Sequence, residues 1–236
     1  MSDPRIIISL DFPKAGDALT FLQNIDPGYC RVKIGKELFT LAGPLFVKQV
    51  IREGFDVFLD LKYHDIPTTV ARACTAAADL GVWMINVHAS GGRQMMAAAK
   101  TALSESGNGP LLIAVTVLTS LNVTDLEEIG IKNSVEEQVL TLAVLANQCG
   151  LDGVVCSAQE AGAIRKMLGK DFILVTPGIR MRHSNHHDQG RVMTPADAIR
   201  SGSDYLVVGR PITQAVDPVK ALQAINEEIN LVIGNS

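Results

Sequence analysis

Short apolar runs rich in β-branched residues alternate along the chain with longer segments in which apolar residues recur at helical spacing. Eight runs predict strands, and their starts are 19 to 42 residues apart, about the length of one strand and one helix. The longest interval leaves room for a short extra helix near Asp125–Ile129 before a main helix at Glu136–Cys149. The predicted strands are Ile6–Asp11, Arg31–Gly35, Asp56–Lys62, Met84–Ala89, Leu111–Leu118, Gly153–Ser157, Phe172–Ile179 and Asp204–Arg210.

Several of these runs are apolar on both faces, which is typical of parallel strands that are covered on both sides. Thr194-Pro195 and Asp217-Pro218 each match a helix N-cap followed by proline at the first helical position. No linker, low-complexity tract or shift in composition divides the 236 residues. We therefore predict one α/β domain over residues 1–236, a (β/α)8 TIM barrel.

The main competing architecture is a doubly wound open sheet, which usually carries a glycine-rich turn after its first strand. Here that turn is Asp11-Phe12-Pro13-Lys14 and contains no glycine. The barrel is therefore favoured. In a barrel, the residues that carry chemistry lie at the carboxyl ends of the strands.

Charge and apolar length exclude several classes of protein. Lys plus Arg number 21 against 25 Asp plus Glu, so the chain is not a globally basic nucleic-acid binder. The longest apolar stretch, Leu111–Leu118, is too short to span a bilayer, and Asp11 interrupts any signal-like segment near the N-terminus. The four cysteines form no C-x-x-C pair, which indicates reduced thiols. We predict a cytoplasmic protein with neither nucleic-acid nor membrane partners.

The third predicted strand carries the most informative polar residues. Asp60 and Lys62 are two residues apart, so both point into the barrel mouth while Leu59 and Leu61 face the helices. Buried charges are costly unless they are paired. Together with Lys33 from the neighbouring strand and Asp65 from the following loop, they predict an alternating array of charges.

Two interpretations of this array remain open. It is either a structural ion-pair network, with Asp65 as a plain N-cap before Ile66-Pro67, or a reactive site. In the second interpretation, two flanking carboxylates hold Lys62 as an ammonium that can donate a proton.

The end of the last strand and the loop after the seventh suggest a phosphate site. Gly209 allows close backbone approach and Arg210 can bind two phosphate oxygens, while Arg180 and Gln189 in the long polar loop could reach the same group. Three histidines of that loop, His183, His186 and His187, match no usual metal motif, so no metal is expected. His88, near the end of the fourth predicted strand, is interpreted as a residue of the barrel core or mouth.

The motif Asp60-x-Lys62-x-x-Asp65-Ile66-Pro67 resembles the signature of the orotidine 5′-phosphate decarboxylases, which complete the de novo synthesis of UMP. The similarity covers the whole chain in order. It also includes Leu10-Asp11, Val32-Lys33-Ile34-Gly35, Val117-Leu118-Thr119-Ser120, Thr176-Pro177-Gly178-Ile179-Arg180, Asp188-Gln189-Gly190-Arg191 and Val208-Gly209-Arg210-Pro211-Ile212.

The resemblance implies roles for the matching positions. Lys62 would donate the proton, Asp60 would lie against the substrate carboxylate, and Lys33 and Asp11 would bind ribose hydroxyls. The remaining implied contacts are those of Asp65 and Thr69 across a homodimer interface, of Ile66 with the substrate, of Thr119 with the pyrimidine, and of Gln189, Arg180, Gly209 and Arg210 with the phosphate.

The implied reaction removes CO2 from C6 of orotate and leaves negative charge on that carbon. No motif for pyridoxal phosphate, thiamine or a metal appears, so no cofactor is expected and the protein must stabilise this carbanion electrostatically. One alternative is a related sugar-phosphate decarboxylase barrel that uses magnesium. Those relatives look to have a metal-binding acid where this chain has the cationic Lys33. The other alternative is a non-catalytic nucleotide-binding barrel.

Overall fold

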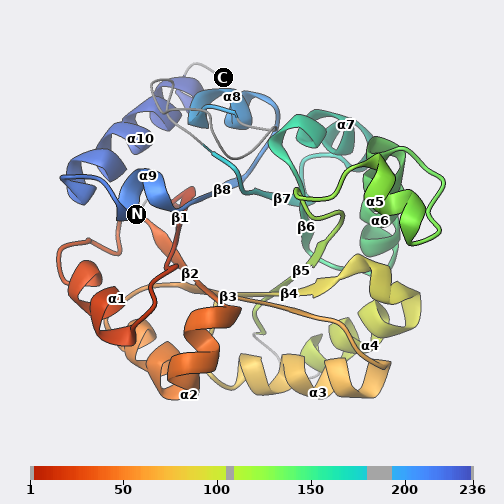
Figure 1. The fold of residues 1–236 in the computed structure, drawn as a ribbon, viewed down its shortest axis with the longest axis horizontal. Coiled ribbons are helices and arrows are strands. Elements are labelled where there is room, and N and C mark those ends of the chain that lie inside the picture. The colour runs from red at the N-terminus through yellow and green to blue at the C-terminus, as the bar shows by residue number, and fades with distance from the viewer. Residues whose placement is uncertain (1–2, 105–108, 180–192, 235–236) are drawn as a thin grey trace.

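The computed structural model describes residues 3–104, 109–179 and 193–234. Within them, eight parallel strands pair in sequence order and close into a barrel, with helices around the outside (Figure 1). The predicted (β/α)8 architecture is therefore confirmed. The strands are β1 (Ile6–Ser9), β2 (Arg31–Gly35), β3 (Val57–Tyr63), β4 (Met84–His88), β5 (Leu111–Val115), β6 (Gly153–Val155), β7 (Ile173–Thr176) and β8 (Tyr205–Val208).

Most strands are followed by a helix that crosses the outside of the barrel. The helix predicted near Asp125–Ile129 is present as α5, and the side chains of Thr194 and Asp217 accept hydrogen bonds at the starts of α8 and α10. The helices are α1 (Ala15–Leu22), α2 (Lys36–Arg52), α3 (Pro67–Ala78), η1 (Ala89–Gly91), α4 (Gly92–Ser104), α5 (Val123–Glu128), α6 (Val135–Gln148), α7 (Ala158–Leu168), α8 (Pro195–Arg200), α9 (Arg210–Thr213) and α10 (Pro218–Ile233). None of the helices in the described ranges is long and apolar enough to cross a membrane.

Several strands end earlier than the apolar pattern predicts. β5 stops at Val115 instead of Leu118, and β1 stops at Ser9 instead of Asp11. Leu10 and Thr116 each donate one further backbone hydrogen bond to the neighbouring strand, and after them the chain leaves the sheet. Hydrophobicity alone therefore does not mark the rim of the barrel.

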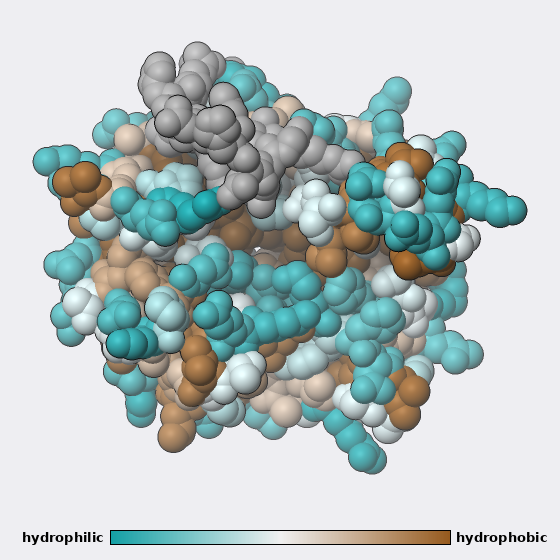
Figure 2. All heavy atoms as spheres, viewed as in Figure 1, coloured by the Kyte–Doolittle hydropathy of each residue, from teal (hydrophilic) through white to brown (hydrophobic). Residues whose placement is uncertain are grey.

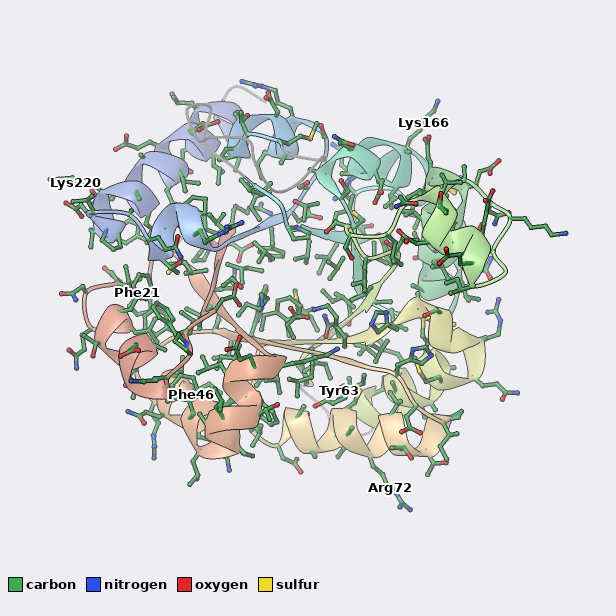
Figure 3. All side chains as sticks on the ribbon, in the orientation of Figure 1. Phe21, Phe46, Tyr63, Arg72, Lys166 and Lys220 are labelled. Carbon is green, nitrogen blue, oxygen red and sulfur yellow. The ribbon has the colours of Figure 1, made fainter. Side chains whose placement is uncertain are left out.

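Apolar side chains pack in two layers. The inner layer fills the barrel, and the outer layer lies between the strands and the helices, where Leu59 is fully buried. In Figure 3, Phe46 of α2 points toward this outer layer, whereas Arg72 and Lys166 extend away from the molecule. The inner layer consists of Ile7, Phe58, Met84, Ile113, Val175, Tyr205 and Val207.

An arginine closes the amino-terminal end of the barrel. Arg31, only 7% exposed, stacks with its guanidinium carbon 4.1 Å from the ring centre of Trp83 and 5.2 Å from that of Tyr205. It also forms ion pairs with Asp3 at 2.7 Å and Asp56 at 3.1 Å. These contacts satisfy the buried charge and fill that end with side chains.

Candidate active site

Toward the carboxyl end, the inward positions of β1, β3 and β4 change from apolar to polar, and β2 contributes the inward-facing Lys33 above Arg31. Alternation along each strand places the polar residues directly above the inner apolar layer. The space-filling view shows a hollow in the middle of this face, bordered by hydrophilic residues on the side of β2 and β3 (Figure 2). The polar residues at these inward positions include Ser9, Lys33, Asp60 and Asn86.

The end of β3 departs from regular strand geometry at Lys62. β3 and β4 pair at Leu59↔Ile85 and again at Tyr63↔Val87, so three residues of β3 lie opposite one residue of β4. Lys62 has a φ of +51°, in the left-handed region that residues other than glycine seldom occupy. Such bulges redirect side chains at barrel rims, and here the bulge directs the Lys62 amine toward Asp60.

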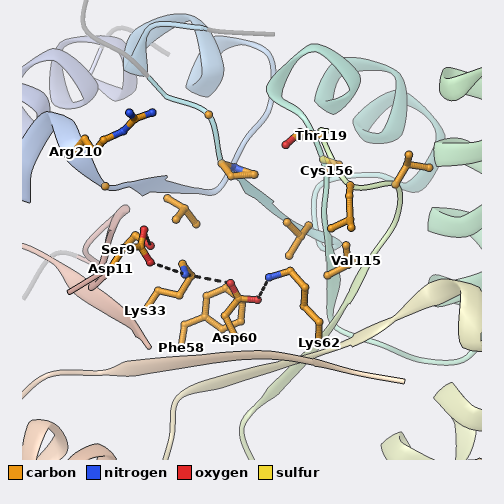
Figure 4. Close-up of a pocket in the computed structure, with 17 residues that line it drawn as sticks. Ser9, Asp11, Lys33, Phe58, Asp60, Lys62, Val115, Thr119, Cys156 and Arg210 are labelled. Atoms are coloured by element: carbon orange, nitrogen blue, oxygen red, sulfur yellow. Dashed lines mark hydrogen bonds and ion pairs between the residues drawn. The ribbon is translucent and has the colours of Figure 1, made fainter. Parts of the chain in front are cut away.

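Four charged side chains form a continuous chain across the mouth (Figure 4). The Lys33 amine lies 3.7 Å from a carboxylate oxygen of Asp11 and 3.2 Å from Asp60, and the Lys62 amine lies 2.6 Å from Asp60. The Ser9 hydroxyl donates to Asp11 at 2.9 Å. The structure thus places an anion, Asp60, between two cations.

Asp60 stays charged although it is only 8% exposed. Burial raises the pKa of its carboxyl. The charges of Lys33 and Lys62, together with hydrogen bonds from Lys62 and Asn86, lower this pKa by more than burial raises it, so the pKa lies below its ordinary value. The mouth therefore contains a fixed anion flanked by two ammonium groups.

A cavity of about 350 Å³ opens over this array, within the range of small-ligand pockets. Thr119 and Arg210 line it on the side away from β3 (Figure 4), and Gly209, next to Arg210 in the chain, also lines it. The rest of its lining in the described residues is Ser9, Asp11, Lys33, Phe58, Asp60, Lys62, Val115, Val117, Leu118, Val155, Cys156, Pro177, Gly178 and Val207. The cavity is thus charged on the β3 side and largely apolar at its base.

A family model described as orotidine 5′-phosphate decarboxylase / HUMPS family matches residues 4–225. The chain belongs to this family. The resemblance inferred from its motifs is thereby confirmed.

Individual members of the orotidine 5′-phosphate decarboxylase family align over nearly the whole chain. The protein named orotidine 5′-phosphate decarboxylase in Pseudoalteromonas atlantica is 60% identical over 97% of this chain and 100% of its own length. The one of that name in Hydrogenovibrio crunogenus is 59% identical over 96% of each. A crystal structure of orotidine 5′-phosphate decarboxylase from Lactobacillus acidophilus superimposes with a TM-score of 0.86 at 40% identity, covering 97% of this chain and 100% of that one.

The structure corrects the predicted position of Asp65. The Asp65 carboxylate is exposed and accepts the backbone N–H of Ile66 at 2.6 Å. Helix α3 begins at Pro67 with Ile66 as its N-cap, so Asp65 is not the cap either. Within the described part of this chain, the ion pairs of the array join Asp11, Lys33, Asp60 and Lys62, so the prediction that Asp65 lies beside Lys62 of the same chain is wrong.

Other predicted site residues lie on the surface or beyond the described ranges. Ile66 is 66% exposed and Thr69 is also exposed. Arg180 and Gln189 lie outside the described residues, as do His183, His186 and His187. The phosphate contacts of Arg180 and Gln189 stay a prediction, as does the expectation that the three histidines bind no metal.

His88 lies at the mouth, as the sequence predicts. Its ring centre is 5.6 Å from that of His64. Burial, helped by the nearby His64, Lys36 and Lys62, lowers the His88 pKa to about 4, so the ring is neutral at physiological pH. In the described ranges, no group of three or more His, Cys, Asp or Glu side chains is arranged to bind a metal ion.

Asn86 belongs to the site although its sequence position was not predicted to do so. This residue is fully buried, and its amide contacts both Asp60 and the backbone of Lys62. The available signal was its position, because it is a polar residue two places before His88 in an otherwise apolar strand.

Proposed function

We propose that this protein decarboxylates orotidine 5′-phosphate to UMP and CO2 in de novo pyrimidine biosynthesis, without a cofactor. The observation that carries the proposal is the Lys62–Asp60–Lys33–Asp11 chain of charges at the cavity mouth. Membership of the family and the names of the relatives at 57 to 60% identity support the same substrate.

The nucleotide would extend across the cavity from the charged side to the opposite rim. Arg210 and Gly209 line that rim, where they would bind the phosphate together with Arg180 and Gln189. Thr119 would contact the pyrimidine. Asp11 and Lys33 would bind the ribose hydroxyls, and this orientation brings the base toward Lys62.

In the reaction, the bond between C6 and the carboxyl carbon breaks, CO2 leaves, and the bonding electron pair remains on C6. The Lys62 ammonium would stabilise this charge and transfer its proton to C6, leaving UMP and a neutral amine that regains a proton from water. A fixed cation near a developing charge is most effective where water is excluded. The side chain of Lys62 is already shielded from most water without substrate, because only 24% of it is exposed.

Asp60 would lie against the substrate carboxylate. Two anions held close together repel each other, and loss of CO2 removes one of them. Lys33 and Lys62 keep Asp60 ionised, so the repulsion persists until the bond breaks. The phosphate contacts would supply the binding energy that brings the two carboxylates together.

We also propose that two copies share their sites in a homodimer. Asp65, Ile66 and Thr69 are exposed in this chain, so all three are available to a second copy. The charged array also borders a second hollow of about 170 Å³, lined further by Lys36 and Glu37 of α2. A partner's carboxylate could approach Lys62 from that side. Its cytoplasmic location, and the lack of nucleic-acid and membrane partners, stay predictions.

The test is the absorbance change of orotidine 5′-phosphate on addition of the protein, with and without EDTA. We expect turnover to UMP that EDTA leaves unchanged. Activity lost with EDTA would favour the magnesium-using sugar-phosphate decarboxylase, and binding of the nucleotide without turnover would favour the non-catalytic barrel. Either result would overturn the proposal.

A further inference from the structure

Asn86 connects the two reactive residues of β3 from the neighbouring strand. The residue lies inside the barrel on β4 and is 0% exposed. Its side-chain oxygen accepts the backbone N–H of Lys62 at 2.8 Å, and its side-chain nitrogen donates to Oδ1 of Asp60 at 2.7 Å. The Lys62 amine binds the same Oδ1 at 2.6 Å. These contacts close a ring through Asn86, Lys62 and Asp60.

The Lys62 backbone needs such a contact. A left-handed conformation in a residue with a long side chain costs about 1 to 3 kcal/mol and persists only where the surroundings impose it. The register shift between β3 and β4 interrupts the regular pairing at this point, and a buried N–H without an acceptor would be a further cost. Asn86 supplies that acceptor and so stabilises the bulge.

The second contact of Asn86 fixes Asp60. Because Oδ1 accepts from both Asn86 and Lys62, the position of the carboxylate is defined in part by a side chain that is itself fully buried on the neighbouring strand. An amide is suited to both tasks, since it carries an acceptor and a donor at a fixed separation. Asn86 does not line the cavity, so it would act through its neighbours and would not touch substrate.

We propose that Asn86 is a positioning residue for the decarboxylation, which fixes the Lys62 ammonium and the Asp60 carboxylate in their reactive arrangement. This inference rests on the proposed function. Loss of the amide would lower kcat with little change in KM, because the phosphate and ribose contacts remain. Misplacement of a reacting group by about 1 Å can cost on the order of 100-fold in rate.

The decisive variant is Asn86→Asp, which keeps the shape of the side chain. While the new carboxyl is protonated, it can still donate to Asp60 and accept from Lys62. Once it ionises, it has no donor and repels Asp60. We therefore expect the kcat of Asn86→Asp to fall with rising pH, by about 100-fold, across a step that the wild-type protein lacks.

The groups that influence this step can be named. Asp60 and Lys62 face the position from β3, Lys33 contributes from β2, and His88 lies two residues along β4, whereas the partner on β5, Ile113, is apolar. Burial lowers the pKa of His88 to about 4, so its ring stays neutral through an assay from pH 5 to pH 9. The same profile measured for the wild-type protein removes the contribution of the remaining groups.

Asn86→Leu provides a second variant, with a low kcat expected at every pH. Ser203→Ala is the matched control: Ser203 is also buried, its hydroxyl pairs with Thr176 at 3.1 Å, and it lies away from the array. Thermal unfolding and UMP binding establish that each variant is folded. If Asn86→Leu does not fold, the pH profile of Asn86→Asp decides alone.

A kcat for Asn86→Asp that follows the wild-type profile would overturn the proposal, as would a loss confined to KM or shared equally by Ser203→Ala. Turnover by the wild-type protein is measured in the same series. Its absence would overturn the proposed function itself, so the two failures are distinguishable.

Discussion

Asp60 shows how single residues set the chemistry of this mouth. Its carboxylate is buried, and burial alone would favour the neutral form, yet two ammonium groups and an amide keep it ionised. Removing one partner of such a buried group leaves an uncompensated charge, which costs about 3 to 5 kcal/mol. The residues of the array are therefore coupled, and the loss of one is expected to disturb the others.

Lys62→Ala should abolish turnover. In the proposed mechanism the variant loses both the cation at C6 and the proton donor, and each of these effects contributes about 100-fold or more. We expect kcat to fall by at least about 10,000-fold in a steady-state assay. Lys100→Ala, which breaks the Lys100–Asp152 ion pair on the outside of the barrel, is the control. Residual activity within tenfold of wild type would contradict the assignment of Lys62.

Arg210→Ala should chiefly weaken substrate binding. A hydrogen bond to a charged group is worth about 1.5 to 3 kcal/mol, so KM should rise roughly 10- to 100-fold while kcat changes little. Inhibition by UMP and by uridine separates the phosphate contribution, because only the nucleotide should lose affinity. An unchanged KM with a lowered kcat would contradict the phosphate role.

His88 should make folding sensitive to mild acid. Its pKa is about 4 in the folded protein against 6.5 when unfolded, so the unfolded state binds the proton first. Its contribution to stability is therefore present above pH 6.5 and is lost as pH falls from 6.5 toward 4. Because the ring is only half-buried, we expect about 1 kcal/mol between pH 7 and pH 5.

The measurement is the free energy of unfolding in urea at both pH values, for the wild-type protein and for His88→Asn. The variant should lose part of the pH dependence. An identical decrease in stability for both proteins would contradict the role of His88.

At the scale of elements, the sequence predicts the order of strands and helices because β-branched runs and helical periods alternate without interruption. It does not predict the bulge at Lys62, since that conformation depends on Asn86 in another strand. It also does not predict where Asp65 points, because its spacing from Lys62 leaves open the direction of the loop. Alternation of side chains along a strand predicts which charges pair inside the barrel, but it does not predict the contacts that loop residues make.

Gly153 on β6 is required by the close approach of β7. A Cβ at this position would lie 2.1 Å from the backbone oxygen of Ile173, so the strands would have to separate. We expect Gly153→Ala to lower the free energy of unfolding by about 2 kcal/mol or more, measured in urea. Gly16→Ala on α1 meets no atom within 4 Å and should be neutral or slightly stabilising. Equal stability of the two variants would contradict this packing.

At the scale of the whole molecule, one barrel end carries the stabilising Arg31 cluster and the other carries the candidate site. This separation explains why the mouth can include a strained lysine and a buried anion without loss of the fold. Asp65, Ile66 and Thr69 are exposed in the single chain, and in the proposed assembly they would contact the second copy.

Mixing Lys62→Ala chains with Asp65→Asn chains tests that assembly. Each variant alone should be inactive, but a mixed dimer has one site with both native residues. Random exchange makes half of the dimers mixed, so activity should recover to roughly a quarter of the wild-type value per chain. Absence of recovery, with subunit exchange shown by a tag on one variant, would argue against Asp65 acting in the partner's site.

The stacked guanidinium of Arg31 limits the routes by which substrate and product can enter and leave the barrel. With the amino-terminal end filled by Arg31, Trp83 and Tyr205, a nucleotide has no path along the axis through the part of the molecule described. Substrate entry and product departure then use the same opening. A bound UMP molecule therefore delays the next substrate, and any cover that forms over the reactants has to withdraw once in every catalytic cycle.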